Sequence, residues 1–573
     1  MRRKFTLITS GGQNFDITKS FFLGQWCDQA LDKKFFLDHH WNDKSKRLKD
    51  YNKLRKLYYS ILKILAKKLN KYHKKDENLI YWEIIIGPWL IFYLSATFDR
   101  WEILRIFFKK NNKIFFLPEV KLNINSLIPN DTKDFYNICT SSNKWNASVF
   151  FKMINYKYHN KILIKKNIQI KDNKEKIQDL SPSFFKKFFL IINKFFCFFS
   201  LRMNPIILDD LFYSSKYTIL LNLRLFQIPG MLGAFFTSEE SKEKININKR
   251  SQMNPTILKN KNLMNYVLEN IFKEIPKCYL EDYNFIENKN FTINKLKKKL
   301  IVINQSYAFN ERFKFWVSKM KKKGAKIFVT NHGGFLPLDI DGFLNFEKKK
   351  TICDKYLTWH KLDKSKNYVY LPPIQLKKYI NIKKRKNDNL LIISSGILKY
   401  ACKLQCWPYA ENFKLVQNFH LDLIKNEIEK IKQKIKFRSF EGPNFFPLTN
   451  NIKKRFSYLS ISDTRKIPLI KELELAKILV CSYPENPINE ALFSKIPFVI
   501  LYPKNIYSEF KKYEKFLLPL KKNKILFHDP KKLSIHLNNI WDEPEKWWLN
   551  NKTQECLRKF KNQIIFDQVD PFS

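Results

Sequence analysis

The stretch KGAKIFVTNHGG, residues 323–334, decides the fold class of this chain. Its apolar run at 327–329 ends abruptly in polar residues, as a buried parallel strand does, and two glycines then let the backbone come close to a ligand. Ligands of open α/β sheets collect at the carboxyl ends of strands. The imidazole of His332 therefore suits a general base that takes a proton from a substrate hydroxyl. A histidine that merely caps the strand is the structural alternative.

Strand and helix patterns alternate on both sides of this stretch. Strands are expected at 299–307, 355–360, 389–396, 476–483 and 497–503, and helices at 311–324, 420–435, 487–495 and 530–540. This order predicts an α/β architecture of two Rossmann-like domains that face a central cleft. The expected segments are an N-terminal domain with helical insertions at 1–375, a linker at 376–388, a C-terminal nucleotide-binding domain at 389–528, and C-terminal helices that pack back on the body at 529–573.

The composition favours a folded protein that does not bind nucleic acid. The 573 residues exceed one ordinary core, and 45% of them are hydrophobic. The net charge of +52 comes mostly from Lys, which accompanies Asn, Ile and Phe along nearly the whole chain. That joint enrichment indicates a compositionally biased, solvated surface, with attraction to anionic membranes or polyanionic substrates as the alternative. The nine scattered cysteines show no zinc pattern and favour a reducing, cytoplasmic compartment.

Two apolar stretches raise the question of a membrane. Residues 79–98, LIYWEIIIGPWLIFYLSATF, reach spanning length, but Glu83 lies inside and Gly87-Pro88 interrupts the middle. A buried helix–turn–helix is therefore expected there. The Phe-rich run at 184–199 is interrupted by lysines and is typical of an amphipathic or interfacial helix. The basic N-terminus lacks an apolar core and is not expected to be a signal peptide, while 120–180 is expected to form loops or an insertion.

A second group of candidate residues follows the strands of the C-terminal half. In CSYPENPINEALFSKIPFVI (481–500), Ser482 ends a strand and Asn486 begins a helix whose N-terminus can hold a phosphate. Glu490 can then bind the ribose hydroxyls of a nucleotide, or it is simply an acid near a helix N-terminus. The other candidate donor-site residues are Gly333, Gly334, Ser394, Ser395 and Arg438, for which plain turn chemistry or solvent exposure is the alternative.

The segment HHWNDK (39–44) gathers polar and aromatic side chains near the N-terminus. His40, Trp41 and Asp43 are candidates for the binding site of a glycan acceptor. An aromatic contact followed by a helix cap explains the same residues structurally.

Several strings together resemble a transferase family of bacterial O-antigen and capsule loci. They are FLGQWC (22–27), HHWNDK (39–44), YWEIIIGPWL (81–90), FDRW (98–101), LFQIP (225–229), GAKIFVTNHGG (324–334), DKYLTWH (354–360), the block from ILVCSY to IPFVILYP (478–503), and FHDPKKL with IWDEPEKWW (527–548). The resemblance covers nearly the whole chain and implies a GT-B-like glycosyltransferase with a helical N-terminal elaboration. The His332 loop is also similar to the WHG-type loop of CDP-glycerol glycerophosphotransferases, where the histidine is the base. This chain has SYPENPINE where the family has a hydroxyl-rich block, which implies a weaker phosphate grip or a different donor.

The hypothesis from the sequence is a cytoplasmic glycosyltransferase, peripheral at the inner face of the cytoplasmic membrane. It would move a sugar from a nucleotide-sugar donor to a surface polysaccharide or its lipid-linked precursor. No cofactor is expected beyond the nucleotide-sugar substrate, and no metal, because helix N-termini and basic side chains would meet the phosphate charge. Transfer of a polyol phosphate from a CDP-linked donor is the alternative enzyme. A non-catalytic glycan- or membrane-binding scaffold is the alternative of another class.

Overall fold

The protein is described here by a computed structural model. It describes residues 5–120, 127–165, 170–171, 184–209, 211, 215–232, 235–236, 243–253, 260–289, 299–304, 306–331, 333, 352–361, 367–380, 382, 388–404, 408–427, 429–507 and 514–566. The chain divides into two compact units. The first unit comprises Met1–Thr330, Asp341–Tyr356 and Tyr400–Gln405, and the second comprises Asn331–Ile340, Leu357–Lys399 and Cys406–Ser573. The four segments expected from the sequence stay a prediction.

The N-terminal part of the chain forms a four-stranded parallel sheet. Its strands are β1 (Phe5–Ile8), β2 (Ser20–Phe22), β3 (Phe115–Pro118) and β4 (Ile162–Lys165), in the order β2-β1-β3-β4. In the sequence, SFFLGQWC (20–27) predicts a strand that leads into a turn, and no strand is expected at the positions of β1, β3 and β4. Each strand is four residues or fewer, which is too short for a clear alternation of apolar and polar residues.

Two long helices build the core next to this sheet. Helix α1 (Lys44–His73) packs on α2 (Leu79–Lys110), and α2 is buried along most of its length. The expected break at Gly87-Pro88 is wrong, because α2 continues through Pro88. A Cβ atom on Gly87 would lie 2.7 Å from the Tyr58 hydroxyl, so this glycine permits close approach of α1 rather than a turn. Helix α2 is long and apolar enough to cross a membrane, yet 89% of its apolar window is buried inside the protein, as in a core helix.

The expectation of loops is wrong for residues 132–158 of the segment 120–180, while the alternative of an insertion stays a prediction. Helices α3 (Thr132–Ser141) and α4 (Asn143–Tyr158) occupy much of this region. Asp131 and Ser142 cap them, each accepting a hydrogen bond from a backbone N–H in the first turn. The buried side chains of α4 include Trp145 and Phe150, so packing compensates for its weak helical periodicity.

A five-stranded sheet contains the strand of the stretch KGAKIFVTNHGG, residues 323–334. Its order is β5-β6-β7-β8-β9. The strands are β5 (Ile206–Asp209), β6 (Leu300–Ile303), β7 (Lys326–Thr330), β8 (Lys355–Thr358) and β9 (Tyr368–Tyr370). Helix α11 (Glu311–Lys322) connects β6 and β7, which are parallel, as the sequence predicted. The other helices of this part are α5 (Phe184–Met203), α6 (Ser215–Arg224), α7 (Ile247–Gln252), α8 (Leu263–Glu274), α9 (Tyr283–Lys289) and α10 (Ser306–Phe309).

The second unit is built on a six-stranded parallel sheet in the order β12-β11-β10-β13-β14-β15. The strands are β10 (Asn389–Ser394), β11 (Ile435–Ser439), β12 (Ser460–Ile461), β13 (Ala476–Cys481), β14 (Phe498–Leu501) and β15 (Leu526–Phe527). The central strands β10 and β13 are almost completely buried. The predicted strands at 389–396, 476–483 and 497–503 are therefore confirmed.

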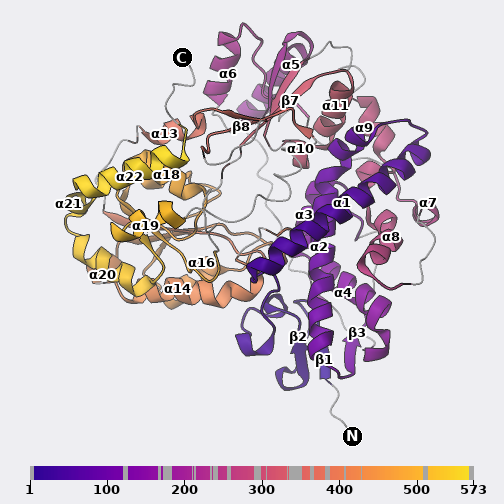
Figure 1. Ribbon diagram of the computed structural model, residues 1–573, viewed down its shortest axis with the longest axis horizontal. Helices are drawn as coiled ribbons and strands as arrows, with labels where there is room; N and C mark the ends of the chain where they lie inside the picture. Colours follow the sequence, from indigo (N-terminus) through magenta and orange to yellow (C-terminus); the bar gives the residue numbers. More distant parts are fainter. Residues whose placement is uncertain are drawn as a thin grey trace. The chain divides into compact units, whose positions relative to one another are not determined.

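Helices precede, separate and follow the strands of this sheet along the chain. They are α13 (Lys377–Ile380), α14 (Phe413–Lys425), α15 (Glu429–Lys432), α16 (Leu448–Arg455), α17 (Leu469–Leu473), α18 (Asn486–Ser494), α19 (Glu514–Lys522), α20 (Pro530–Ile540), α21 (Pro544–Trp548) and α22 (Asn551–Ile564). The single helix expected at 420–435 is wrong. Helix α14 begins seven residues earlier, at Phe413, and ends at Lys425, and β11 already begins at Ile435. Figure 1 follows these elements along the chain.

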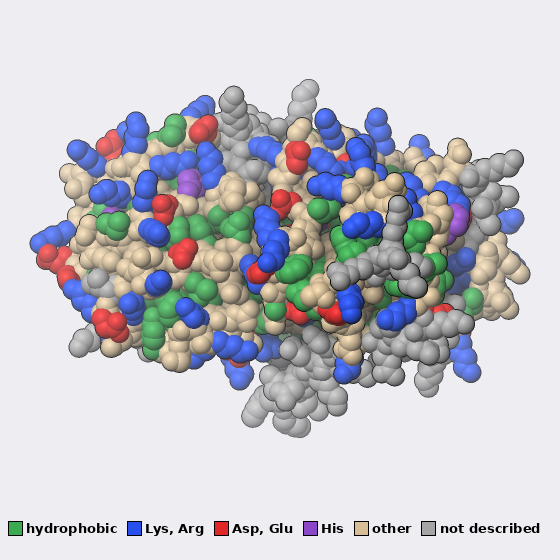
Figure 2. Space-filling model, turned by 90° about the horizontal axis from the view of Figure 1, so that it is seen from below, with side chains coloured by type: hydrophobic (Ala, Val, Ile, Leu, Met, Phe, Trp, Pro, Cys, Tyr) green, Lys and Arg blue, Asp and Glu red, His purple; other side chains and the backbone are tan. Residues whose placement is uncertain are grey.

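The fold class is confirmed as α/β built on parallel sheets. Every strand pair whose register is described is parallel. On the face of the molecule that Figure 2 shows, Lys and Arg side chains are spread among apolar and acidic ones. This dispersal agrees with the interpretation of the charge as a solvated surface.

Candidate functional site

The strand order of the six-stranded sheet places a candidate site at the carboxyl ends of β10 and β13. From β10 the chain proceeds outward to β11 and β12, and it then returns to build β13, β14 and β15 on the other side. The order therefore reverses between β10 and β13. Open α/β sheets bind ligands outside the carboxyl ends of the strands at such a switch point. Ser394 ends β10 and Ser482 follows β13, so two predicted site residues lie at this point.

The Ser482 hydroxyl links the two strands and a helix behind them. Its Oγ atom lies 2.7 Å from the Ile393 carbonyl oxygen of β10 and 2.7 Å from Nε2 of His420 in α14. His420 Nδ1 lies 2.8 Å from the Val416 carbonyl, so the ring contacts the preceding turn of α14 through one nitrogen and Ser482 through the other. Burial lowers the pKa of His420 to about 4, so the ring is neutral at neutral pH. Ser482 and His420 together fasten the loop after β13.

Ser394 is placed differently, because its hydroxyl is buried and has no hydrogen-bond partner among the described residues. A buried hydroxyl without a partner costs free energy unless a ligand or water completes it. Ser395, the next residue, lies with its Oγ 3.3 Å from the Tyr507 hydroxyl. Gly396 then permits close packing, because a Cβ there would lie 2.6 Å from the Phe445 ring.

The loop after β7 reaches the N-terminus of α18 within the second unit. A Cβ atom on Gly333 would lie 2.1 Å from Oδ1 of Asn486, the first residue of α18, and Gly333 has a φ of +145°. Only glycine adopts this conformation without strain. The structure thus brings together two predicted site residues, Gly333 and Asn486, that are far apart in the sequence. His332 and Gly334 lie outside the described residues.

Glu490 lies one turn into α18 and accepts a hydrogen bond of 2.8 Å from the Tyr379 hydroxyl of α13. Burial raises the pKa of Glu490, and the Tyr379 hydrogen bond and the nearby Lys378 and Arg438 counteract that rise. Tyr379 therefore fixes one carboxylate oxygen and favours the ionised form, which is the form that accepts hydrogen bonds from sugar hydroxyls.

Arg438 of β11 is anchored inside the protein. Its NH1 group donates to Ser462 Oγ at 2.9 Å and to the Ile467 carbonyl at 2.8 Å, and it lies 3.5 Å from a carboxylate oxygen of Glu472. The guanidinium contributes positive charge near Glu490 through this fixed position. Its direct contact with a donor phosphate stays a prediction.

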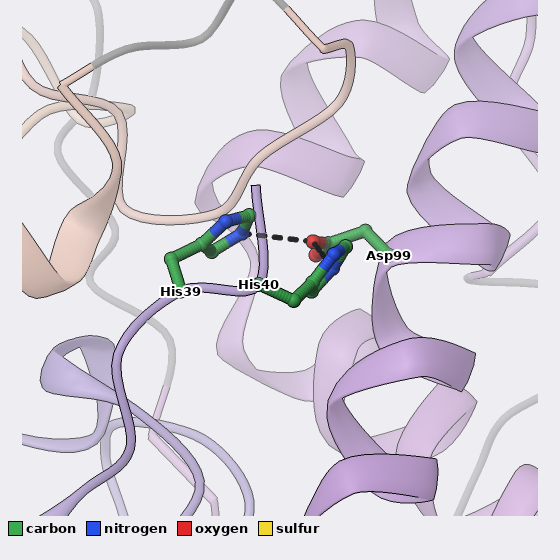
Figure 3. A group of neighbouring side chains, drawn as sticks. All are labelled: His39, His40 and Asp99. Carbon is green, nitrogen blue, oxygen red and sulfur yellow. Dashed lines mark hydrogen bonds and ion pairs between the residues drawn. The ribbon is translucent and has the colours of Figure 1, made fainter. Parts of the chain in front are cut away.

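A separate polar cluster lies in the first unit (Figure 3). Nε2 of His39 and Nε2 of His40 lie 2.9 and 3.0 Å from the same oxygen, Oδ1 of Asp99 in α2. His39 Nδ1 accepts a hydrogen bond from the Trp41 backbone N–H, whereas His40 Nδ1 is buried without a hydrogen-bond partner among the described residues. Burial lowers the pKa of His40 to about 4, and the neutral ring carries its proton on Nε2, toward Asp99.

Hydrogen bonds explain this cluster without a metal ion. Two imidazoles and a carboxylate are suitable zinc ligands, and their candidate ligand atoms lie within 4.8 Å of one another. However, the second Asp99 oxygen is 2.9 Å from NH1 of Arg100, whose other donors bind Asn146 and the Cys139 carbonyl. Burial works to raise the pKa of Asp99, but His39, His40 and Arg100 hold it well below its usual range. A cation here would have to displace both imidazole protons next to a buried guanidinium.

The neighbouring residues of the HHWNDK segment have structural contacts. Trp41 is fully buried, and its Nε1–H donates to Asp50 at 3.2 Å. Asp43 is the N-cap of α1 and accepts a hydrogen bond of 3.0 Å from the Lys46 backbone N–H. This is the helix cap that the sequence offered as the alternative to an acceptor site. The role of His40, Trp41 and Asp43 in binding an acceptor stays a prediction.

Sequence reasoning did not single out four residues of the two clusters: His420, Tyr379, His39 and Asp99. His420 could have been found, because it recurs at helical spacing with Phe413, Val416 and Ile424 on the buried face of α14. No local signal links Tyr379 to Glu490, or Asp99 to the two histidines.

Comparison with known proteins gives a family and several structural likenesses. The family model described as LIC12162 family transferase matches residues 4–571. No curated protein matches the chain significantly. Among solved structures, the wall teichoic acid polymerase TagF is similar at 10% identity with a TM-score of 0.29, over 50% of this chain and 80% of that chain. The spinosyn forosaminyltransferase SpnP is similar at 10% identity with a TM-score of 0.29, over 63% and 94%. At these scores the fold assignment rests on the strand orders described above.

Proposed function

The chain belongs to the LIC12162 family of transferases, and from that premise we propose that it transfers a sugar from a nucleotide-sugar donor to a glycan. In this reaction the bond between the anomeric carbon and the donor phosphate breaks, and a bond to an acceptor hydroxyl oxygen forms. The nucleotide leaves with the phosphate, and the hydroxyl proton passes to a base. The family membership makes the chain an enzyme and counts against a purely non-catalytic scaffold.

The observation that carries this proposal is the switch point between β10 and β13. The strand order reverses there, and the buried Ser394 hydroxyl at the end of β10 has no hydrogen-bond partner among the described residues. A donor phosphate or a water that it orders would complete that hydroxyl. The N-terminus of α18 and the carboxylate of Glu490 lie beside the same sheet edge, where they suit the phosphates and the ribose hydroxyls of a nucleotide.

In this proposal His332 is the base that accepts the proton of the acceptor hydroxyl. It is the residue before Gly333, whose backbone approaches Asn486 at the first turn of α18. The base would thus be held close to the donor phosphates by a loop that only glycine can build at this place. Phosphate charge would be met by the helix N-terminus and basic side chains without a metal ion.

The acceptor is proposed to be a bacterial surface polysaccharide of the O-antigen or capsule type, or its lipid-linked precursor, with His40, Trp41 and Asp43 on the acceptor side. The enzyme would then work in the cytoplasm, in peripheral contact with the anionic inner face of the membrane. The resemblance of the HHWNDK and NHGG strings supports this acceptor class.

Product analysis tests the reaction type. The purified chain is incubated with UDP-, GDP- and CMP-linked sugars or with CDP-glycerol, together with a lipid extract, and the products are separated. Sugar transfer yields a glycoside without a phosphodiester, and His332→Ala should lose turnover while it keeps its melting temperature. A product with a phosphodiester, formed from CDP-glycerol with release of CMP, would instead establish polyol-phosphate transfer. Full turnover in His332→Ala would remove this histidine from the mechanism.

A further inference from the structure

Helix α5 of the first unit turns its apolar face outward. Six large apolar side chains are 40–66% exposed at the i, i+1, i+3, i+4, i+7 and i+8 positions of one helical stripe: Phe188, Phe189, Ile191, Ile192, Phe195 and Phe196. The opposite stripe is buried although it is partly polar, with Asn193, Cys197 and Ser200. This arrangement is the reverse of an ordinary surface helix, whose apolar stripe faces the core.

Polar contacts fix this orientation. The Asn193 amide donates to the Met231 carbonyl and accepts from the Met231 backbone N–H, both at 2.9 Å. Asn204, just after α5, makes the same pair of contacts with Ile228, at 2.8 and 3.0 Å. Gly230 lets this segment lie against the helix, because a Cβ there would be 3.1 Å from Cα of Cys197. The inner stripe and Asn204 therefore bind the backbone of residues 228–231, and the phenylalanine side chains of the opposite stripe stay exposed.

Helix α6 and the turn after it extend the exposed apolar surface. Ile219, Leu220 and Leu223 of α6 are at least 36% exposed. In the following turn Phe226 is 99% exposed and has a φ of +53°, a left-handed conformation that is unfavourable for a bulky side chain. Ile228, two residues further, hydrogen-bonds through its backbone to Asn204 just after α5, so the turn after α6 lies beside the C-terminal end of α5. Both helices are labelled in Figure 1.

The ionisable residues of the two helices carry charge of one sign. The described basic side chains are Lys194 and Arg202 on helix α5 and Lys216 and Arg224 on helix α6, and neither helix contains an acidic residue in its sequence. Lys194, Arg202, Lys216 and Arg224 are exposed. Lys and Arg can hold their charged ends at a polar boundary while their stems cover apolar surface.

We propose that the outer face of α5 and α6, here called the α5–α6 face, docks on an anionic lipid bilayer. Phenylalanine and isoleucine side chains would enter the boundary between headgroups and acyl chains, and the surrounding cations would contact anionic headgroups. Like charge argues against a second copy, because a twofold interface would bring the basic residues of two helices together while neither helix contains an acidic residue. The proposal holds whether or not sugar transfer is correct, since docking needs no donor.

Vesicle flotation of the full chain tests this docking. Wild-type protein should float with phosphatidylcholine vesicles that contain 30% phosphatidylglycerol and remain in the bottom fraction with phosphatidylcholine alone. The double variant Ile191→Asp/Phe195→Asp should bind at least tenfold more weakly. The matched control Ile535→Asp changes a side chain that is equally exposed, at 62%, on α20 of the second unit, and it should bind as the wild type does. Both changes affect exposed side chains, so melting temperatures should stay within a few degrees.

Three results would overturn the proposal. In the first, the wild type does not float with any vesicle. In the second, the double variant floats as well as the wild type, so that the binding would come from dispersed surface charge and not from the α5–α6 face. The double variant could also reduce the molar mass in light scattering without changing flotation, which would assign the face to a second copy. The variant Lys194→Glu/Arg202→Glu provides a further check, because it keeps the apolar stripe and should still lose binding to anionic vesicles.

Discussion

At the residue scale, Gly333 is a position that only glycine can occupy without strain. An added Cβ would overlap the Asn486 amide, and the φ of +145° is unfavourable for any other residue. We expect Gly333→Ala to destabilise the second unit by about 1–3 kcal/mol and to reduce turnover. Thermal unfolding and the transfer assay measure both effects. Gly442→Ala is the matched control, since the nearest atom to its added Cβ is 3.9 Å away, and equal losses in the two variants would contradict this account.

Tyr379 provides a second prediction at this scale. Its hydroxyl lowers the pKa of Glu490, which burial raises. Removing that hydroxyl in Tyr379→Phe should therefore raise the pKa of Glu490 further. If ionised Glu490 binds the donor, the loss of nucleotide affinity on acidification should begin at a higher pH than in the wild type. Calorimetric titrations between pH 5 and 8 measure it, with the exposed Tyr458→Phe as control. An acid limb that stays in place or moves to lower pH would contradict the role of Glu490.

The residue scale also shows how far the sequence alone reaches. The ends of β10 and β13 follow from their apolar runs, so Ser394 and Ser482 could be placed at one sheet edge in advance. Helical spacing places His420 on a buried face, but its pairing with Ser482 could not be predicted, because the two residues lie 62 positions apart on different elements. The Ser482 hydroxyl has hydrogen-bond partners, whereas the Ser394 hydroxyl has none among the described residues. This difference depends on tertiary contacts that no local sequence pattern contains.

At the element scale, α1 depends on its cap. Asp43 accepts a hydrogen bond from the first turn, so Asp43→Ala should lower the free energy of unfolding by about 1 kcal/mol. Asp43→Asn keeps a good cap and should retain the stability. Denaturant unfolding and the transfer assay separate the two roles considered for this residue. If Asp43→Asn lost turnover at unchanged stability, Asp43 would bind the acceptor in addition to capping the helix.

Elements were predicted well where apolar runs were long, and poorly where single residues were taken as breaks. The strand KIFVT and the helix after β6 agree with their patterns. The break expected at Gly87-Pro88 is wrong for two reasons. The glycine allows close contact with Tyr58, and the burial of α2 along its length outweighs the hydrogen bond lost at Pro88. Helices α3 and α4 were missed because their caps and buried aromatic residues, rather than a strong periodicity, define them.

At the scale of the whole molecule, buried histidines make stability depend on pH. Burial lowers the pKa of His40, His73, His420 and His536 from 6.5 to about 4. The unfolded chain binds these four protons first as pH falls, so stability should fall from about pH 6.5 toward pH 4. Glu427 opposes this trend between pH 4.5 and 8, because burial raises its pKa to about 8. The raised pKa values of Glu490 and Asp134 act in the same direction as Glu427, but the four histidines outnumber these three carboxyl groups.

Melting temperatures at pH 7, 6 and 5 test this dependence. The decrease on acidification should become smaller in His536→Gln, which removes one buried imidazole, and should not change in His159→Gln, which replaces an exposed one. A protein whose melting temperature rises between pH 7 and pH 5 would show that other groups control its acid response.

For the molecule as a whole, we propose a nucleotide-sugar donor site at the carboxyl edge of the six-stranded sheet. Isothermal titration calorimetry with CMP, CDP, UDP and GDP and their sugar conjugates tests it most directly. The account predicts that one nucleotide family binds the wild type, that Glu490→Gln weakens this binding at least tenfold, and that Glu555→Gln, an exposed acid on α22, leaves it unchanged. Binding that is equally strong in Glu490→Gln, or no binding of any nucleotide, would contradict it.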